Sequence, residues 1–294
     1  MNTSVPNLLP NLLKDPPPSF AFELSAGGVA FARTSAVEQR GFQPFDGGIL
    51  KISPVHDNVQ NAEGLKAAID QIIPTDGRKR RVALILPDYC ARVAVLDFDS
   101  FPAGADEQLA LVRFRMKKSV PFDVESAVIS YYTQPHAAKS KIDVVVAIMA
   151  REIVTRYEAP FRAAAMQPGF VTTSSLAMLN MIDPLGLTVV AKLSGSTLTA
   201  MVLDGATLKL ARCIEMDTPS RDEIESVLHP TFAYIEDELS AKPDRLLLCG
   251  FGADTPELAR DWQAQWCAAV EPLRSRFGAP AQTDAGLLGY LESQ

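Results

Sequence analysis

The amino-acid sequence predicts an α/β protein made of two similar lobes. The order hairpin, third strand, helix and buried strand occurs twice along the chain, once in each half. With 294 residues the chain is long enough for two lobes, since one domain takes about 150 residues. Hydrophobic residues make up 47% and charged residues 21% of the sequence, which is the composition of a globular protein. We therefore expect two lobes with a cleft between them, where ligands commonly bind.

The first lobe is predicted to span residues 20–175, after a flexible tail at 1–19. Prolines punctuate the tail, and proline lacks an amide donor and restrains the residue before it. Two short apolar runs on either side of a Ser-Ala-Gly-Gly turn predict a hairpin at the start of the lobe. The elements expected next are a third strand near 49–52, an amphipathic helix at 62–73 and a buried strand at 82–86 that ends at Pro87.

Strand and helix patterns continue beyond the buried strand. They lie at 92–98, 106–119, 127–133 and 143–150. Pro121 ends the helical pattern, because proline cannot continue a helix. A further helix is predicted at 151–166.

The second lobe, predicted at 176–294, repeats the plan of the first. A hairpin pattern at 187–193 and 197–203 surrounds a Ser-Gly-Ser turn, and an Asp-Gly turn leads into a third strand at 208–214. A long helix is expected at 221–239, because polar residues that can cap it stand just before it. A buried strand at 245–249 and a helix at about 256–270 complete the second copy.

Several classes of function are excluded or disfavoured by composition and spacing. The net charge of −7 argues against a nucleic-acid partner, since phosphate backbones are bound through lysine and arginine. The four cysteines form no CxxC pair and the three histidines are scattered, which removes most zinc and histidine-based chemistry. No phosphate-binding P-loop is present, and Gly250 to Thr255 fails the dinucleotide fingerprint because threonine stands in its last position. The longest apolar run, at 144–150, is far below the ~20 residues that a membrane-spanning helix needs. With no secretory signal visible, a reducing cytoplasm is expected.

The order of the motifs resembles the actin-like superfamily and, within it, the family of the type IV pilus assembly protein PilM. The match runs in order from about residue 20 to the end of the chain, and its most specific part is Ala-Leu-Ile-Leu-Pro at 83–87 followed by the inserted subdomain. The resemblance implies two ribonuclease-H-like lobes, with a small α+β subdomain inserted in the first lobe at about residues 88–150. It also implies that a Gly- and Ser-rich turn in each lobe faces nucleotide phosphates, and that a Gly pair after a strand meets the adenosine. The positions that correspond to this ATP site are Glu23, Ser25, Gly27, Lys192, Ser194, Gly195, Ser196, Gly250 and Gly252.

The sequence departs from the family where the family expects an aspartate and then a glycine in each phosphate turn. The first pair here is Glu23 and Ser25, and the second is Lys192 and Ser194. A lysine cannot coordinate magnesium, which needs oxygen ligands, although it can neutralise a phosphate. A Lys192 fully paired across the cleft with Glu23 would instead be structural. We therefore expect ATP binding to be weak or lost and magnesium not to be held, and no residue is predicted to be catalytic. Asp204 is assigned to its Asp-Gly turn, and no other carboxylate is nominated as a base.

The resemblance implies a function as a cytoplasmic scaffold, held at the inner membrane by a partner. In the PilM family, the bitopic membrane protein PilN inserts a short cytoplasmic peptide containing Asn-Leu-Leu-Pro into a groove. The tail of this chain carries the same four residues, Asn7-Leu8-Leu9-Pro10, and we hypothesise that it docks into its own groove or into that of a neighbour. Two alternative functions stay open, an active actin-like ATPase and a GspL-like component of type II secretion. The formation of a homo-oligomer also stays open.

Overall fold

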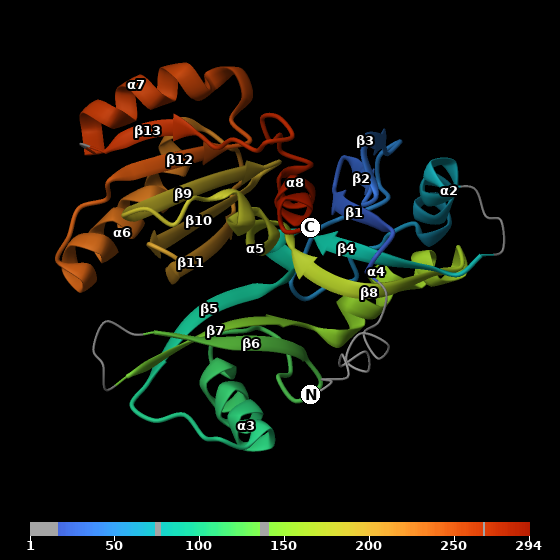
Figure 1. The fold of residues 1–294 in the computed structure, drawn as a ribbon, viewed down its shortest axis with the longest axis horizontal. Helices are drawn as coiled ribbons and strands as arrows, with labels where there is room; N and C mark the ends of the chain where they lie inside the picture. Colours follow the sequence, from blue (N-terminus) through green and yellow to red (C-terminus); the bar gives the residue numbers. More distant parts are fainter. Residues whose placement is uncertain (1–16, 74–77, 136–140, 267) are drawn as a thin grey trace, which may run out of the picture.

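The computed structural model describes residues 17–73, 78–135, 141–266 and 268–294. Two lobes lie side by side, and a smaller subdomain extends from them (Figure 1). Each lobe contains a five-stranded sheet, and the subdomain contains a three-stranded one. The predicted α/β fold with an inserted subdomain therefore describes the architecture that is observed.

The sheet of the first lobe has the order β3-β2-β1-β4-β8. Its hairpin is antiparallel, and β4 and β8 continue the sheet in parallel. The lobe comprises β1 (Phe20–Ser25), β2 (Gly28–Arg33), β3 (Ala36–Pro44), α2 (Ala62–Ile72), β4 (Arg80–Leu86), η1 (Asp88–Cys90), α4 (Arg151–Ala163) and β8 (Met166–Thr173).

The sheet of the second lobe has the order β11-β10-β9-β12-β13, which repeats the order and directions of the first sheet strand for strand. The repeated plan predicted from the sequence is therefore confirmed. The lobe comprises β9 (Leu187–Ser194), β10 (Thr197–Asp204), β11 (Thr207–Glu215), α6 (Arg221–Leu239), β12 (Arg245–Cys249), η3 (Gly252–Asp254), α7 (Thr255–Trp266) and β13 (Ala269–Pro272).

The inserted subdomain has the sheet order β5-β7-β6, and α3 covers this sheet on the side away from the lobes (Figure 1). Its elements are β5 (Arg92–Phe98), α3 (Ala105–Met116), β6 (Val128–Pro135) and β7 (Ile142–Met149). The subdomain also contacts the second lobe. The Lys209 ammonium lies 3.4 Å from Asp143, and the Gln134 amide exchanges two hydrogen bonds with the backbone of Leu208.

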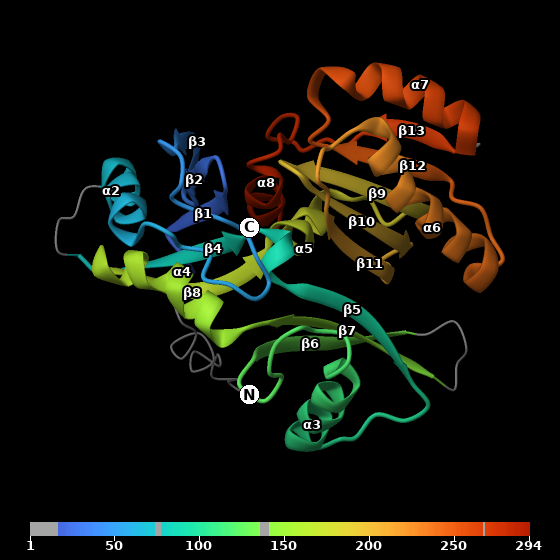
Figure 2. The ribbon, with the colours of Figure 1, turned by 180° about the vertical axis from the view of Figure 1, so that it is seen from behind.

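Each large sheet buries one face against its own pair of helices. In the first lobe α2 and α4 cover the face that carries Phe22 and Leu84. In the second lobe α6 and α7 cover the face that carries Val189 and Leu246, as Figure 2 shows from behind. This burial of alternate strand residues supplies the hydrophobic stabilisation of both lobes.

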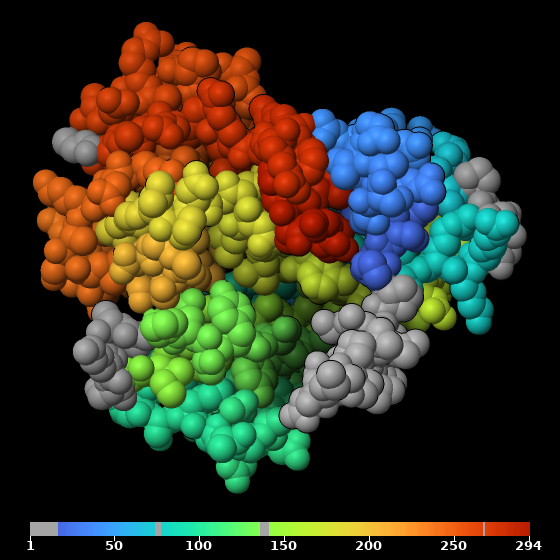
Figure 3. Space-filling view, viewed as in Figure 1, coloured from blue at the N-terminus to red at the C-terminus, as the bar shows by residue number. Residues whose placement is uncertain are grey.

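The opposite faces of the two sheets are turned toward the centre of the molecule, where other elements cover them. There α5 (Ser174–Met178), η2 (Leu179–Met181) and the C-terminal α8 (Ala285–Glu292) pack on the inner face of the first sheet, which is rich in alanine. Figure 3 shows α8 in red between the second lobe and the blue strands of the first. A Cβ atom on Gly289 would lie 2.2 Å from the carbonyl oxygen of Ala177, so only glycine allows α8 to approach α5 this closely.

Three expectations about single elements were wrong or incomplete. Residues 49–52 do not form the third strand, since only a bridge between Leu50 and Val59 is found there, and the third strand is the exposed edge strand β3. The helix expected to reach residue 270 ends at Trp266, and the short β13 follows it. β8 was not predicted because it contains Pro168 and Gly169, which are tolerated only at a sheet edge or a bulge.

Among the helices of the described residues, none combines the length and the apolar character needed to cross a bilayer.

Candidate functional site

A cleft of about 390 Å³ lies between the two lobes. This volume is at the low end of the ~300–1,000 Å³ typical of small-molecule sites. The turns of the two hairpins face each other across it, because β1–β2 and β9–β10 occupy equivalent places in the two sheets. The predicted site residues that line the cleft are Glu23, Ser25, Gly27, Lys192, Ser194, Gly195 and Ser196. Gly250 and Gly252 lie outside its lining.

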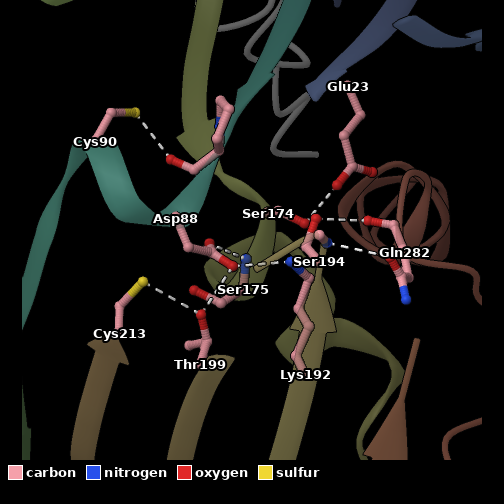
Figure 4. Close-up of polar contacts among 12 residues, drawn as sticks. Glu23, Asp88, Cys90, Ser174, Ser175, Lys192, Ser194, Thr199, Cys213 and Gln282 are labelled. Atoms are coloured by element: carbon pink, nitrogen blue, oxygen red, sulfur yellow. Dashed lines mark hydrogen bonds and ion pairs between the residues drawn. The ribbon is translucent and has the colours of Figure 1, made fainter. Parts of the chain in front are cut away.

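Lys192 forms a buried ion pair across the cleft with Asp88, a residue that the sequence did not single out (Figure 4). Its Nζ atom lies 2.8 Å from Oδ2 of Asp88, and both side chains are almost fully buried. Asp88 also accepts hydrogen bonds from the Thr199 hydroxyl at 3.2 Å and from the Ser175 amide at 2.7 Å. Lys192 and Thr199 belong to the second lobe, whereas Asp88 follows β4 of the first. The carboxylate therefore joins the two lobes.

Glu23 does not pair directly with Lys192. One of its carboxylate oxygens accepts a hydrogen bond from the Ser174 hydroxyl, and the other accepts one from the Leu287 amide at 2.7 Å. The carboxylate thus binds the first turns of both α5 and α8, where free amide donors and the helix dipole favour a negative group. Glu23 therefore fastens the central helices to β1.

Burial and charge change the acid–base behaviour of both groups. Burial alone would lower the pKa of Lys192, but the negative charges of Asp88 and Glu23 more than offset this and raise it above 10.5. Burial raises the pKa of Glu23 above its ordinary 4.5, and Lys192 and the Ser174 hydroxyl offset only part of that rise. Lys192 is therefore charged at neutral pH, and the proton of Glu23 is held more tightly than in the unfolded chain.

The turn of the second hairpin is occupied by Gln282, from the segment before α8 (Figure 4). The Gly195 amide donates a 3.1 Å hydrogen bond to the Gln282 side-chain oxygen, and the side-chain nitrogen donates one to the carbonyl of Gly250 at 2.9 Å. The Ser194 hydroxyl donates to the backbone carbonyl of Gln282 at 2.8 Å. The Gly195 amide and the Ser194 hydroxyl of this turn are thus bonded within the protein.

A second concave region, which we call the groove, lies where the subdomain meets the first lobe. Its volume is about 430 Å³ and its lining includes Val128, Ile148, Val154, Phe170, Val171 and Leu176. Val128, Phe170 and Val171 are partly exposed, at 38%, 44% and 37%. The strands β6 and β8 border the groove, and both are edge strands in the described sheets. The backbone of each is therefore paired with a neighbouring strand on one side only.

Comparison with solved structures shows a strong likeness to a pilus protein complex. A chain of a solved PilM–PilN type IV pilus biogenesis complex matches with a TM-score of 0.70 and 16% identity, over 94% of this chain and 98% of that one. A weaker match is an actin-like ATPase fold protein of unknown function from Bacteroides thetaiotaomicron, with 15% identity over 86% of this chain and 89% of that one and a TM-score of 0.49. Another is the cytoplasmic domain of EpsL, an inner-membrane component of the Vibrio cholerae type II secretion system, with 15% identity over 78% of this chain and 80% of that one and a TM-score of 0.48. No protein-family model and no curated protein matches the sequence.

The chain has the actin-like fold. The resemblance to PilM that the motif order predicted therefore holds at the level of the fold.

An actin-like fold implies a magnesium–nucleotide site, and the residues of this cleft do not fit one. Each carboxylate oxygen of Glu23 and Asp88 already accepts a hydrogen bond from a protein donor. The described residues contain no group of three or more histidine, cysteine or acidic side chains placed to hold a metal. Magnesium requires several oxygen ligands in octahedral geometry, and a cation of the protein itself, Lys192, already pairs with Asp88.

Asp88 and Gln282 are the residues of the cleft that the sequence did not reveal. Asp88 carried a signal, because an acidic residue directly after a buried central strand lies at the carboxyl edge of a sheet, where sites form. Gln282 carried none, since it lies in a stretch without periodicity, far along the chain from the turn it occupies. Asp204, by contrast, stands where the Asp-Gly turn predicted, exposed at the end of β10.

Proposed function

We propose that this protein is a PilM-like scaffold of a type IV pilus or related secretion platform, cytoplasmic and held at the inner membrane by a peptide of a bitopic, PilN-like partner. The observation that carries the proposal is the likeness to the chain of the PilM–PilN complex, which extends over 94% of the protein and includes the inserted subdomain. Fold alone does not determine function, so the proposal also depends on a suitable surface.

The groove has the features that a peptide site requires. An extended peptide can form backbone hydrogen bonds with an open strand edge, and its leucines can occupy apolar hollows between side chains. β8 and β6 supply such edges, and Val128 and Val171 supply exposed apolar surface. A peptide with the sequence Asn-Leu-Leu-Pro matches this surface because it offers apolar side chains and no net charge.

The scaffold is proposed to work without ATP hydrolysis. The carboxylates of the cleft are bonded to protein donors, and phosphoryl transfer depends on metal ions that neutralise developing charge. The rival function is an active actin-like ATPase, and a turnover assay at saturating magnesium-ATP separates the two. Release of phosphate that depends on protein concentration would overturn the scaffold proposal.

The decisive experiment measures the affinity of a fluorescent peptide that contains Asn-Leu-Leu-Pro. Val171→Glu and Val128→Glu place a charge in the groove and are expected to weaken binding by about tenfold or more, because a buried unpaired charge is costly. Val55→Glu is the matched control, since Val55 is 45% exposed and lies outside the groove. An equal loss of peptide affinity in all three variants, or no loss in any of them, would contradict the groove as the docking site.

The hypothesis about the tail concerns Asn7 to Pro10, which lie outside the described residues. If the tail docks into a groove, deletion of residues 1–14 raises the affinity for the partner peptide or changes the oligomer size. The same peptide titration, together with light scattering, checks this. Unchanged affinity and unchanged size would remove the hypothesis.

A further inference from the structure

The contacts across the cleft form a continuous set that links both lobes to the central helices. Asp88 of the first lobe is bonded to Lys192 and Thr199 of the second. The segment 282–287 bonds to the second lobe through Gln282 and to the first lobe through the Leu287 amide on Glu23. The lobes are therefore connected by direct polar bonds at two places.

These bonds involve the groups that would otherwise face a bound ligand. The Gln282 side-chain oxygen accepts from the Gly195 amide in the second turn, which is how a phosphate oxygen is bound by a glycine-rich turn. The Lys192 ammonium provides a positive charge beside two carboxylates, which is the electrostatic role of a divalent cation. Each substitute is part of the chain, so it binds intramolecularly and does not depend on the concentration of a free ligand.

We propose that Lys192 and Gln282 act as a built-in substitute for a metal and a phosphate, and so hold the two lobes closed when no nucleotide is bound. The set formed by Asp88, Lys192, Glu23 and Gln282 is the interlobe clamp. Its action depends on no partner peptide, so it stands or falls separately from the function proposed above.

The clamp predicts the hydrogen-exchange behaviour of the two hairpin turns in the full-length protein. Peptides covering 23–29 and 192–198 should be protected in the wild type, and magnesium-ATP at millimolar concentration should add no protection. Asp88→Asn combined with Lys192→Met removes both members of the ion pair, while Glu23 keeps its hydrogen bonds from Ser174 and Leu287. This double variant should raise exchange in both turns by about tenfold, because local opening becomes easier.

Two further variants keep the test decisive. Lys209→Met is the matched control, because it removes a second buried ion pair between separate parts of the described chain, with Asp143, and leaves the clamp intact. It should not change exchange in the turns. Gln282→Ala removes a side chain without removing a buried charge, so it provides a test even if the double variant does not fold. It should raise hydrogen exchange at 194–198. Added protection of the wild-type turns by magnesium-ATP, or unchanged exchange at 194–198 in Gln282→Ala, would overturn the clamp.

Discussion

The cleft and the groove are both concave, but they differ in whether their polar groups are already bonded and their apolar groups already buried. In the cleft the buried charges of Glu23, Asp88 and Lys192 are all bonded within the protein. In the groove, apolar side chains are partly exposed, and the bordering strands β6 and β8 each have one backbone edge that pairs with no other strand of the described sheets. A ligand in the cleft would have to replace bonds that already exist, whereas a ligand in the groove would gain bonds and bury apolar surface. This difference supports the proposal that the cleft serves stability and that the groove is the surface for recognition.

The largest effect is expected from Lys192→Met. Removal of the lysine leaves Asp88 buried without its counterion, and breaking a buried pair in this way costs about 3–5 kcal/mol of unfolding free energy. Chemical denaturation measures the loss. Lys66→Met, which removes the part-exposed pair with Asp70, should cost less than about 1 kcal/mol. Similar losses in the two variants would mean that the cleft is no more important to stability than the surface.

A smaller loss is expected from Gln282→Ala. The substitution removes two side-chain hydrogen bonds, to Gly195 and Gly250, each of which contributes about 0.5–1.5 kcal/mol. The bond from Ser194 to the backbone carbonyl of residue 282 is retained, which limits the loss. Thermal or chemical denaturation checks the value, and an unchanged unfolding free energy would show that the turn does not need its internal partner.

Glu23 is expected to make stability depend on pH. Because its pKa is raised in the folded state, the stability it contributes is fully present below the ordinary pKa of 4.5 and is lost as pH rises through the folded value. Glu23→Gln keeps an acceptor for the Leu287 amide and removes the titration. Relative to the wild type, the variant should therefore gain stability as pH rises from 4.5 to 8. Denaturation curves at several pH values measure this, and a difference that stays constant with pH would contradict it.

The smallest effect on stability is expected in the groove. Val171→Glu should change the unfolding free energy by no more than about 0.5 kcal/mol, since Val171 is 37% exposed and surface substitutions cost little. The same variant is expected to lose peptide binding. A loss of stability as large as that of Lys192→Met would show that the groove, too, is part of the structural core.

The elements that the sequence predicted well are those with a strong local pattern. α6 and β12 begin and end where the periodicity and the caps predicted, because Ser220 accepts a hydrogen bond from the Glu223 amide and β12 is a continuous apolar run. The edge strands β3, β8 and β13 were missed or misplaced. An edge strand contacts the core on fewer sides, so its sequence carries little alternation, and β8 can even contain a proline.

The sequence by itself determined the α/β class and the repeated order of the two lobes. These follow from local periodicity and from glycine at turns, which neighbouring residues decide. The inserted subdomain and the two turns that face the cleft were implied by the resemblance to the PilM family. Only the tertiary structure decided that Lys192 pairs with Asp88, that Glu23 binds α8, and that Gln282 occupies the second turn. Each of these contacts joins residues more than 80 positions apart in the chain. Which donor meets which acceptor over such distances depends on how the lobes pack, and no local pattern records that.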